Sequence, residues 1–240
     1  MSLKKHLEAL ETYRANNDER GIANTCFKIG DIYLQKGSWE EAKEYLREAK
    51  AICGKLGNDE GCALTSIGLG DVYCNSKNHQ TARIHYQQAL DFFKSRGDEK
   101  NIANLLERLG ELHKNEGHLS KALEAFSKAR DICLSHDDQL GVAHFSERMA
   151  LVHRQEENFD LAIESFQQAL LYYERHRVAD RIAFVLTGLG ELSYNMGHYQ
   201  KGLEWLGRAL QIYQKLGAKK PVELVAAEIA LIEAALADER

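Results

Sequence analysis

The chain has 240 residues, of which 44% are hydrophobic and 28% charged, and its formal net charge is −5. This acidic balance argues against a general nucleic-acid binder, which carries a basic face, and no apolar run reaches the roughly 18 residues needed to cross a bilayer. The N-terminus also lacks an apolar stretch of signal-peptide type. Cysteines without a C-x-x-C pair favour a reducing, cytoplasmic setting; they are Cys26, Cys53, Cys62, Cys74 and Cys133.

Residues 1–20 have the pattern of a helix that belongs to the repeated part of the chain. Ala9 occupies the place of Ala49, and Tyr13 the place of Cys53, in the repeats that follow. We expect these residues to be the second helix of a partial repeat. Three interpretations stay open: an array that continues upstream, an N-terminal cap, and self-association through an exposed apolar face of this helix.

Residues 21–220 repeat one pattern five times with a period of forty residues and no insertion. The clearest copy is Leu69-Gly70-Asp71-Val72-Tyr73, followed by Ala82, Tyr86 and Ala89, and the equivalent segments begin at Ile29, Leu109, Met149 and Leu189. A fixed period in this range is typical of a solenoid. We therefore expect one solenoid over residues 1–240, with full repeats at 21–60, 61–100, 101–140, 141–180 and 181–220.

Each repeat is predicted to contain two helices. In the first repeat, apolar residues between Ile22 and Tyr33 follow the i, i+3, i+4, i+7 spacing of an amphipathic helix. Ser38 and Glu41 have the spacing of a capping box at the start of the second helix. That helix is expected to end at Gly57, because glycine readily adopts the left-handed conformation that follows a helix.

The end of the second helix differs among the repeats. Gly97 and Gly217 take the place of Gly57, whereas Asp137 and Arg177 stand there in the third and fourth repeats. We expect the turns at Asp137 and Arg177 to be less regular than the others.

Small residues recur at four places of the repeat. We call the residues that stand forty apart a column, and number each column by its member in the first repeat. Columns 23 and 49 are alanine throughout, column 30 is glycine apart from Ala150, and column 42 is alanine apart from Gly202. Small residues let neighbouring helices approach closely, so these columns are predicted to be packing positions. By the same argument the glycines are not a phosphate-binding loop.

Residues 221–240 are expected to form a C-terminal capping helix. Pro221, the only proline, suits the first turn of a helix. Ile229 and Ala230 continue columns 29 and 30 of the first helices. The polar residues Glu223, Glu228 and Glu233 suggest one side in contact with water.

The pattern L-G-x-x-Y, then A-x-x-x-[FY] and a later alanine, resembles the tetratricopeptide repeat. The resemblance covers nearly the whole chain and implies an all-α fold, a right-handed superhelical solenoid of antiparallel helix pairs with about twelve helices. The unit departs from the common 34 residues and lacks the family's tryptophan and proline. A forty-residue unit ending in Gly97-Asp98 is similar to the longer repeats of Pins-type spindle-orientation adaptors, and more loosely to those of kinesin light chains.

In this family the first helices of successive repeats line a concave groove that binds peptides. The resemblance places columns 24, 28, 31 and 35 in that groove, and these places share one helical face. Column 35 consists of carboxamides, and column 31 is acidic apart from Leu151. The predicted peptide-binding residues are Asn24, Lys28, Asp31, Gln35, Asp71, Asn75, Asn104, Arg108, Glu111, Asn115, Arg148, Gln155, Glu191 and Asn195.

These residues predict a non-enzymatic interaction scaffold. An Asn or Gln side chain both donates and accepts hydrogen bonds, so a row of them can pair with the main chain of an extended peptide. The acidic column favours a protein or peptide partner with basic or mixed charge. A regulatory or sensory repeat domain of a larger signalling protein or transcription regulator is the alternative, and no nucleic-acid or membrane partner is expected.

No other constellation points to chemistry. The ten histidines include no H-E-x-x-H motif and no metal-binding spacing with cysteine, so no metal, cofactor or catalytic residue is expected. His113 and His153 stand in the column of Tyr33 and are predicted to be packing residues, whereas His118 and His198 fall in turns.

Overall fold

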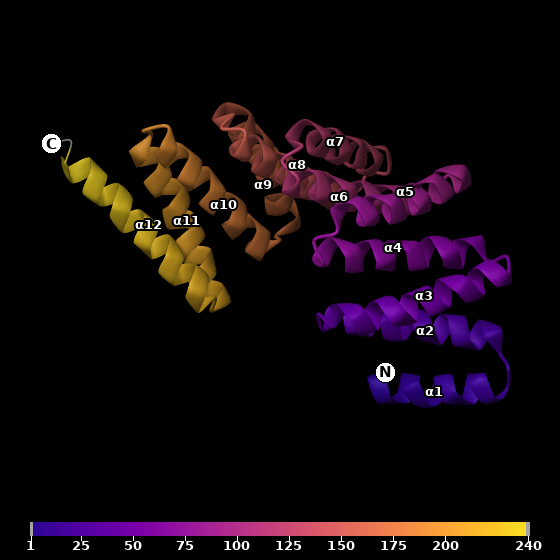
Figure 1. Cartoon of the computed structure of the whole chain (residues 1–240). Coiled ribbons are helices and arrows are strands. Elements are labelled where there is room, and N and C mark those ends of the chain that lie inside the picture. Colours follow the sequence, from indigo (N-terminus) through magenta and orange to yellow (C-terminus); the bar gives the residue numbers. More distant parts are fainter. Residues whose placement is uncertain (1, 239–240) are drawn as a thin grey trace. The chain divides into compact units, whose positions relative to one another are not determined.

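A computed structural model of the chain describes residues 2–238, which form twelve α-helices and no strand. The fold is all-α, a solenoid of antiparallel helix pairs, as predicted (Figure 1). Met1, Glu239 and Arg240, which the predicted terminal helices included, lie outside the described residues. The helices are α1 (Leu3–Ala15), α2 (Glu19–Gln35), α3 (Trp39–Lys55), α4 (Asp59–Asn75), α5 (His79–Arg96), α6 (Glu99–Asn115), α7 (Leu119–Ser135), α8 (Gln139–Gln155), α9 (Phe159–His176), α10 (Ala179–Asn195), α11 (Tyr199–Leu216) and α12 (Lys219–Asp238).

The helices fall into two compact units, unit 1 (Met1–Gly117) and unit 2 (His118–Arg240). Inside each unit a helix packs against its neighbours in sequence. The alternate helices α2 and α4 also touch in unit 1, as do α10 and α12 in unit 2. In each unit, one first helix therefore also contacts the helix that starts the next repeat.

The small columns are packing positions, as predicted. Every member of columns 23, 30, 42 and 49 is buried. At Gly70 a Cβ atom would lie 2.4 Å from Cε1 of Tyr86, and at Gly190 it would lie 2.5 Å from Cγ of Leu206. The large residues of column 46 therefore occupy the space that these glycines leave free. Column 53 packs in the same core, with Cys53 and Cys133 both buried.

Asp and Asn side chains cap the starts of several helices, whereas the capping box predicted at Ser38 is not formed. Ser38 precedes α3 but its side chain makes no capping hydrogen bond, so the predicted box with Glu41 is wrong. Asp and Asn side chains instead cap five helices, each accepting from the backbone N–H three residues later: Asp18 to Gly21 (2.9 Å), Asn58 to Gly61 (2.9 Å), Asn78 to Thr81 (3.2 Å), Asp98 to Asn101 (3.1 Å) and Asp138 to Gly141 (2.9 Å). Four of these five helices (α2, α4, α6 and α8) are first helices of a repeat.

The ends of the second helices share one turn geometry, which overturns the prediction of less regular turns. Gly57 and Gly97 are left-handed, with φ of +64° and +65°, as expected. Asp137 and Arg177 adopt the same conformation, with φ of 55° and 57°. The closing bond is also retained: the backbone N–H of Asp138 donates to the Cys133 carbonyl at 2.8 Å. The packing of successive repeats imposes the turn, and a residue with a Cβ tolerates it at a cost of roughly 1–2 kcal/mol.

The terminal helices differ in how much apolar surface they leave exposed. In α1, Leu10 is buried and Leu7 packs with it against α2. Part of the apolar face of α1 is therefore packed inside unit 1, and self-association through this helix stays a prediction. In α12, Pro221 lies in the first turn as predicted, while Leu224 and Leu231 are 58% and 64% exposed. Glu223 and Glu233 are exposed, as predicted. Glu228 is half-buried, so the prediction that it faces water is wrong.

No helix within residues 2–238 is long and apolar enough to cross a membrane.

Candidate functional site

The predicted binding residues lie on one face of the first helices, which we call the first-helix face of unit 1 (α2, α4 and α6) and of unit 2 (α8 and α10). They separate into two groups by exposure. The exposed group contains Asn24, Lys28, Asp31, Gln35, Asn75, Asn104, Asn115, Gln155 and Asn195. The half-buried group contains Asp71, Arg108, Glu111, Arg148 and Glu191. The carboxamides of column 35 are thus exposed, while three acids of column 31 (Asp71, Glu111 and Glu191) are half-buried.

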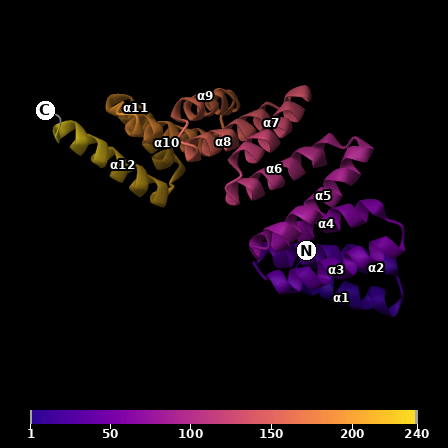
Figure 2. The ribbon, with the colours of Figure 1, turned by 45° about the horizontal axis from the view of Figure 1, so that its top comes forward.

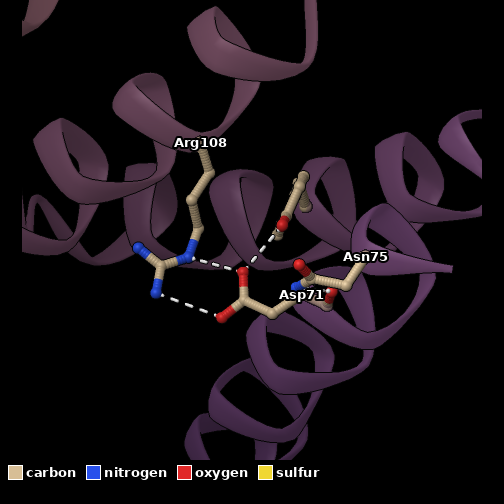
Figure 3. A network of polar contacts seen from close by, with 4 residues as sticks. Asp71, Asn75 and Arg108 are labelled. Carbon is tan, nitrogen blue, oxygen red and sulfur yellow. Dashed lines mark hydrogen bonds and ion pairs between the residues drawn. The ribbon is translucent and has the colours of Figure 1, made fainter. Parts of the chain in front are cut away.

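In unit 1 the half-buried Asp71 and Arg108 belong to one network of polar contacts (Figure 3). Asp71 of α4 accepts hydrogen bonds from Nε and a terminal nitrogen of Arg108 on α6, at 2.9 and 3.1 Å. Its Oδ1 also accepts from the Tyr86 hydroxyl on α5, at 2.7 Å. Burial, together with the neighbouring Asp71 carboxylate, raises the pKa of Tyr86. The hydroxyl therefore stays protonated and donates a hydrogen bond to Asp71.

Two of the exposed carboxamides bond within their own helix. Gln35 Nε2 donates to Asp31 Oδ2 at 3.0 Å. Asn75 Nδ2 donates to the Asp71 backbone carbonyl at 2.8 Å, and Figure 3 shows it beside the Asp71–Arg108 pair. Each amide keeps a second N–H donor and its carbonyl oxygen. These residues are held in place without losing their ability to bond a ligand.

The predicted acidic centre of the face is largely neutralised inside the protein. Glu111 pairs with Lys114 on the same helix at 2.6 Å, and Glu191 pairs with Arg154 at 2.5 Å. Asp71 is matched by Arg108 as described, which leaves Asp31 as the acid of the column that is exposed and without an ion pair among residues 2–238. A long basic ligand attracted along the whole column is therefore less favourable than the sequence suggested.

Column 28 changes character along the chain. Lys28 is exposed, whereas Gly68 and Gly188 are buried where a Cβ would meet the preceding second helix. At Gly188 that atom would lie 2.9 Å from the ring of Phe166. The glycines of this column are thus packing residues, while Arg108 reaches the acid of the preceding repeat.

A pocket in unit 2 includes two predicted residues, Glu191 and Asn195. It lies between α10, α11 and α12, three helices that run side by side in Figures 1 and 2. Its volume is about 280 Å³, and the other lining residues are Tyr194, Leu206, Glu228, Leu231 and Ile232. Leu206 and Ile232 are buried at its base, and Tyr194 and Leu231 are exposed at its edge. We call it the α12 pocket.

Glu228 is the residue of this pocket that the sequence reasoning missed. Its Oε2 atom is buried and finds no hydrogen-bond partner in the part of the chain that the structure describes. Burial raises the pKa of Glu228, and the neighbouring Glu191 adds to the increase, although Arg154 opposes it. The forty-residue period was a signal for it: continued into α12, the period assigns Glu228 to column 28 and Leu231 to column 31.

The four histidines that the sequence analysis named lie in the helices and turns where they were expected. His113 and His153 are half-buried, and Nδ1 of each lies near the glutamate three residues on, at 3.6 Å from Glu116 and 3.5 Å from Glu156. His118 and His198 precede α7 and α11 and are exposed, as predicted.

Two family models match the chain. The model of the family described as soluble NSF attachment protein, SNAP, matches residues 21–169, and a tetratricopeptide repeat model matches residues 139–215. No protein of curated function matches the sequence significantly. The tetratricopeptide resemblance is confirmed, while the narrower similarity to Pins-type repeats stays a prediction.

Several solved structures share the fold. BtubC (BKLC) from P. vanneervenii has a TM-score of 0.78 at 17% identity, over 90% of this chain and 91% of that one. Aspartyl phosphate phosphatase F from Bacillus subtilis has a TM-score of 0.79 at 14% identity, over 94% of this chain and 58% of that one. The Rap conjugation gene regulator of plasmid pLS20, solved in complex with the Phr* peptide, has a TM-score of 0.67 at 18% identity, over 92% and 61%. At these identities the likeness concerns the fold alone.

Proposed function

Because the chain belongs, over residues 21–169, to the family described as soluble NSF attachment protein, SNAP, and carries tetratricopeptide repeats, we propose that it is a non-enzymatic interaction scaffold. Its ligand is a peptide or helical segment bound on the first-helix face. In this role the chain catalyses no reaction, and its partner is a protein or peptide.

The observation that carries the proposal is the exposure of every carboxamide in column 35. Gln35, Asn75 and Asn115 end α2, α4 and α6 in unit 1, and Gln155 and Asn195 end α8 and α10 in unit 2. Each lies at the same place on its helix, one repeat apart from the next. Amides in this arrangement offer regularly spaced donors and acceptors to the main chain of a peptide.

Peptide binding by a protein of the same fold supports the proposal. The Rap regulator in complex with the Phr* peptide, and a Rap protein complexed with competence and sporulation factor, both align with more than nine tenths of this chain. These ligands are bound by the Rap proteins themselves. For this chain they support a ligand class, an extended or helical segment, and no particular sequence.

A peptide-display screen on the folded chain tests the proposal. The screen is run in parallel on a variant with Asn75→Ala, Asn115→Ala and Asn195→Ala, and we expect enriched peptides to lose binding to this variant by at least about tenfold. The control carries three exposed carboxamides of second helices replaced in the same way: Gln87→Ala, Gln167→Ala and Gln200→Ala. Equal binding to both variants would contradict a role for column 35.

A regulatory repeat domain within a larger protein is the second candidate. It is favoured by the Rap conjugation gene regulator, of which this chain covers 61%. An antibody against the chain, used on an extract of its source organism, tests this candidate by mass. A band well above 27.2 kDa supports it, and a band at that mass argues against it.

A further inference from the structure

The α12 pocket occupies the same place in its repeat as the Asp71–Arg108 pair in unit 1. Arg108 follows Asp71 by 37 residues, from column 31 of one repeat to column 28 of the next. Glu228 follows Glu191 by the same interval and between the same columns. Where unit 1 places a cation against its acid, unit 2 places a second acid.

The space that the guanidinium fills in unit 1 is open in unit 2. Figure 3 shows Arg108 extending toward Asp71, where two of its nitrogens each donate to one carboxylate oxygen. At the equivalent place in unit 2 the structure has the pocket of about 280 Å³. Leu206 stands in the column of Tyr86, so an apolar wall replaces the hydroxyl that bonds Asp71.

The charges at the pocket leave one carboxylate without a counterion. Arg154 of α8 pairs with Glu191. Glu228 faces Glu191 and Arg154, and its Oε2 has no hydrogen-bond partner within residues 2–238. A buried carboxylate oxygen without a partner is unfavourable. A cation with N–H donors that enters the pocket reduces this cost through its charge and its hydrogen bonds to Glu228.

We propose that the α12 pocket binds an arginine side chain of the peptide ligand, with the guanidinium between Glu228 and Glu191. This inference rests on the proposed function for the peptide that carries the arginine. The bound guanidinium occupies the place that Arg108 occupies beside Asp71. The protein thus contains, in unit 1, an internal copy of the contact that it makes with its ligand in unit 2.

The lining of the pocket favours arginine over other cations. Leu206, Leu231 and Ile232 offer apolar surface to the aliphatic stem. Tyr194 offers an aromatic ring at the edge, on which a planar guanidinium stacks. The volume lies below the roughly 300–1,000 Å³ of small-molecule sites, so it fits one side chain. Asn195 at the rim is the last carboxamide of column 35 and is placed to bond the adjoining main chain.

Binding of a blocked amino acid tests the pocket without the rest of the peptide. The probes are N-acetyl-arginine N-methylamide and its neutral counterpart N-acetyl-citrulline N-methylamide, titrated into the full chain and followed by NMR. We expect the arginine derivative to shift the resonances of Tyr194, Leu231 and Ile232 with a millimolar dissociation constant. The citrulline derivative should bind at least about tenfold more weakly, because it cannot form the charge-assisted bond.

Three variants at the pocket and its helix complete the experiment. Glu228→Gln removes the charge, and Glu228→Arg places a guanidinium 37 residues after Glu191, as Arg108 is placed after Asp71. Both should weaken binding of the arginine derivative at least about tenfold. Glu233→Gln makes the same chemical change at an exposed place of α12 outside the pocket, and binding should be unchanged. Equal binding to Glu228→Gln and the native chain would overturn the proposal.

A second comparison identifies the source of the arginine and separates this proposal from the proposed function. The pentapeptide acetyl-Ala-Ala-Arg-Ala-Ala-amide should bind more tightly than the blocked amino acid, and Asn195→Ala should remove that gain. Equal affinity of the two probes would overturn the peptide origin of the guanidinium. Failure of column 35 in the display screen would leave the titration of the blocked amino acid interpretable, because that probe has no extended main chain.

Discussion

Asp71 accepts hydrogen bonds from Arg108 and Tyr86, so one carboxylate joins side chains of α4, α5 and α6. The ion pair is partly exposed, with 37% of the arginine side chain and 26% of the aspartate side chain accessible. Exposure at this level limits the Coulomb energy of the pair. The larger stabilising contribution comes from the three hydrogen bonds that the ionised Asp71 carboxylate accepts, two from Arg108 and one from Tyr86.

Replacing either partner of this pair should destabilise the protein. Arg108→Ala leaves the half-buried Asp71 carboxylate without its counterion, and we expect a loss of about 1–3 kcal/mol in the free energy of unfolding. Urea unfolding of Arg108→Ala, Asp71→Ala and the double variant measures the coupling between them. Additive effects would contradict a direct contribution of the pair.

Glu228 should make stability depend on pH in the opposite sense to a paired acid. Its folded pKa is raised above the ordinary 4.5, so the folded state holds its proton more tightly than the unfolded state. Its contribution to stability is therefore fully present below pH 4.5 and is lost as the pH rises through the folded pKa. Glu228→Gln cannot ionise, and should raise the melting temperature at pH 7.

The gain in melting temperature from Glu228→Gln should vanish as the pH falls below 4.5. Melting curves from pH 4 to pH 8, with Glu233→Gln as the control at an exposed site, measure it. A gain that stays constant over this range would mean that ionisation of Glu228 is not its cause. If Glu228→Gln both stabilises the protein and loses arginine binding, Glu228 lowers stability in favour of ligand binding.

Within each helix pair, glycine at column 30 sets how closely the two helices approach. Gly70→Ala would place a Cβ 2.4 Å from the ring of Tyr86, which is buried and held by Asp71. We expect this variant to lose about 1–3 kcal/mol of stability through overpacking. Gly207→Ala, in α11 with nothing within 4 Å of the new atom, should instead gain about 0.5–1 kcal/mol. Urea midpoints compare the two.

At the ends of the second helices, the turn is imposed on residues that do not favour it. Arg177 has a φ of 57°, in the region that glycine adopts most readily. Arg177→Gly should therefore raise stability by about 0.5–1 kcal/mol. Asp131→Gly, an exposed position inside α7, should lower it, because glycine in a helix interior is unfavourable. A loss in both variants would mean that Arg177 is not strained.

For the whole molecule, contacts between neighbours in sequence predict that a local change stays local. Inside each unit a helix packs against the next, with few contacts at longer range. Hydrogen exchange of Gly70→Ala should thus accelerate in α3, α4 and α5 and stay unchanged in α10, α11 and α12. Uniform acceleration over all helices would indicate that the chain opens as a single cooperative unit, unlike most repeat arrays.

Much of the fold can be predicted from the sequence because the same pattern recurs in five successive repeats. Any one copy of Leu69-Gly70-Asp71-Val72-Tyr73 is weak evidence, but columns of small residues in register leave little choice of packing. Helix capping was less predictable. Ser38 has the residue type of a cap without the bond, because a capping bond requires a backbone and rotamer geometry that residue type alone does not supply.

The candidate site was likewise predictable only in part. The sequence by itself determined which residues share the first-helix face, since the 3.6-residue period and the forty-residue repeat suffice for that. Only the tertiary structure decided which of those residues are already satisfied. Arg108 reaches Asp71 and Arg154 reaches Glu191, whereas Glu228 meets Glu191 without a cation of its own. These pairings join residues of different repeats, and their charge balance depends on distances in space, which the order of residues in the chain does not contain.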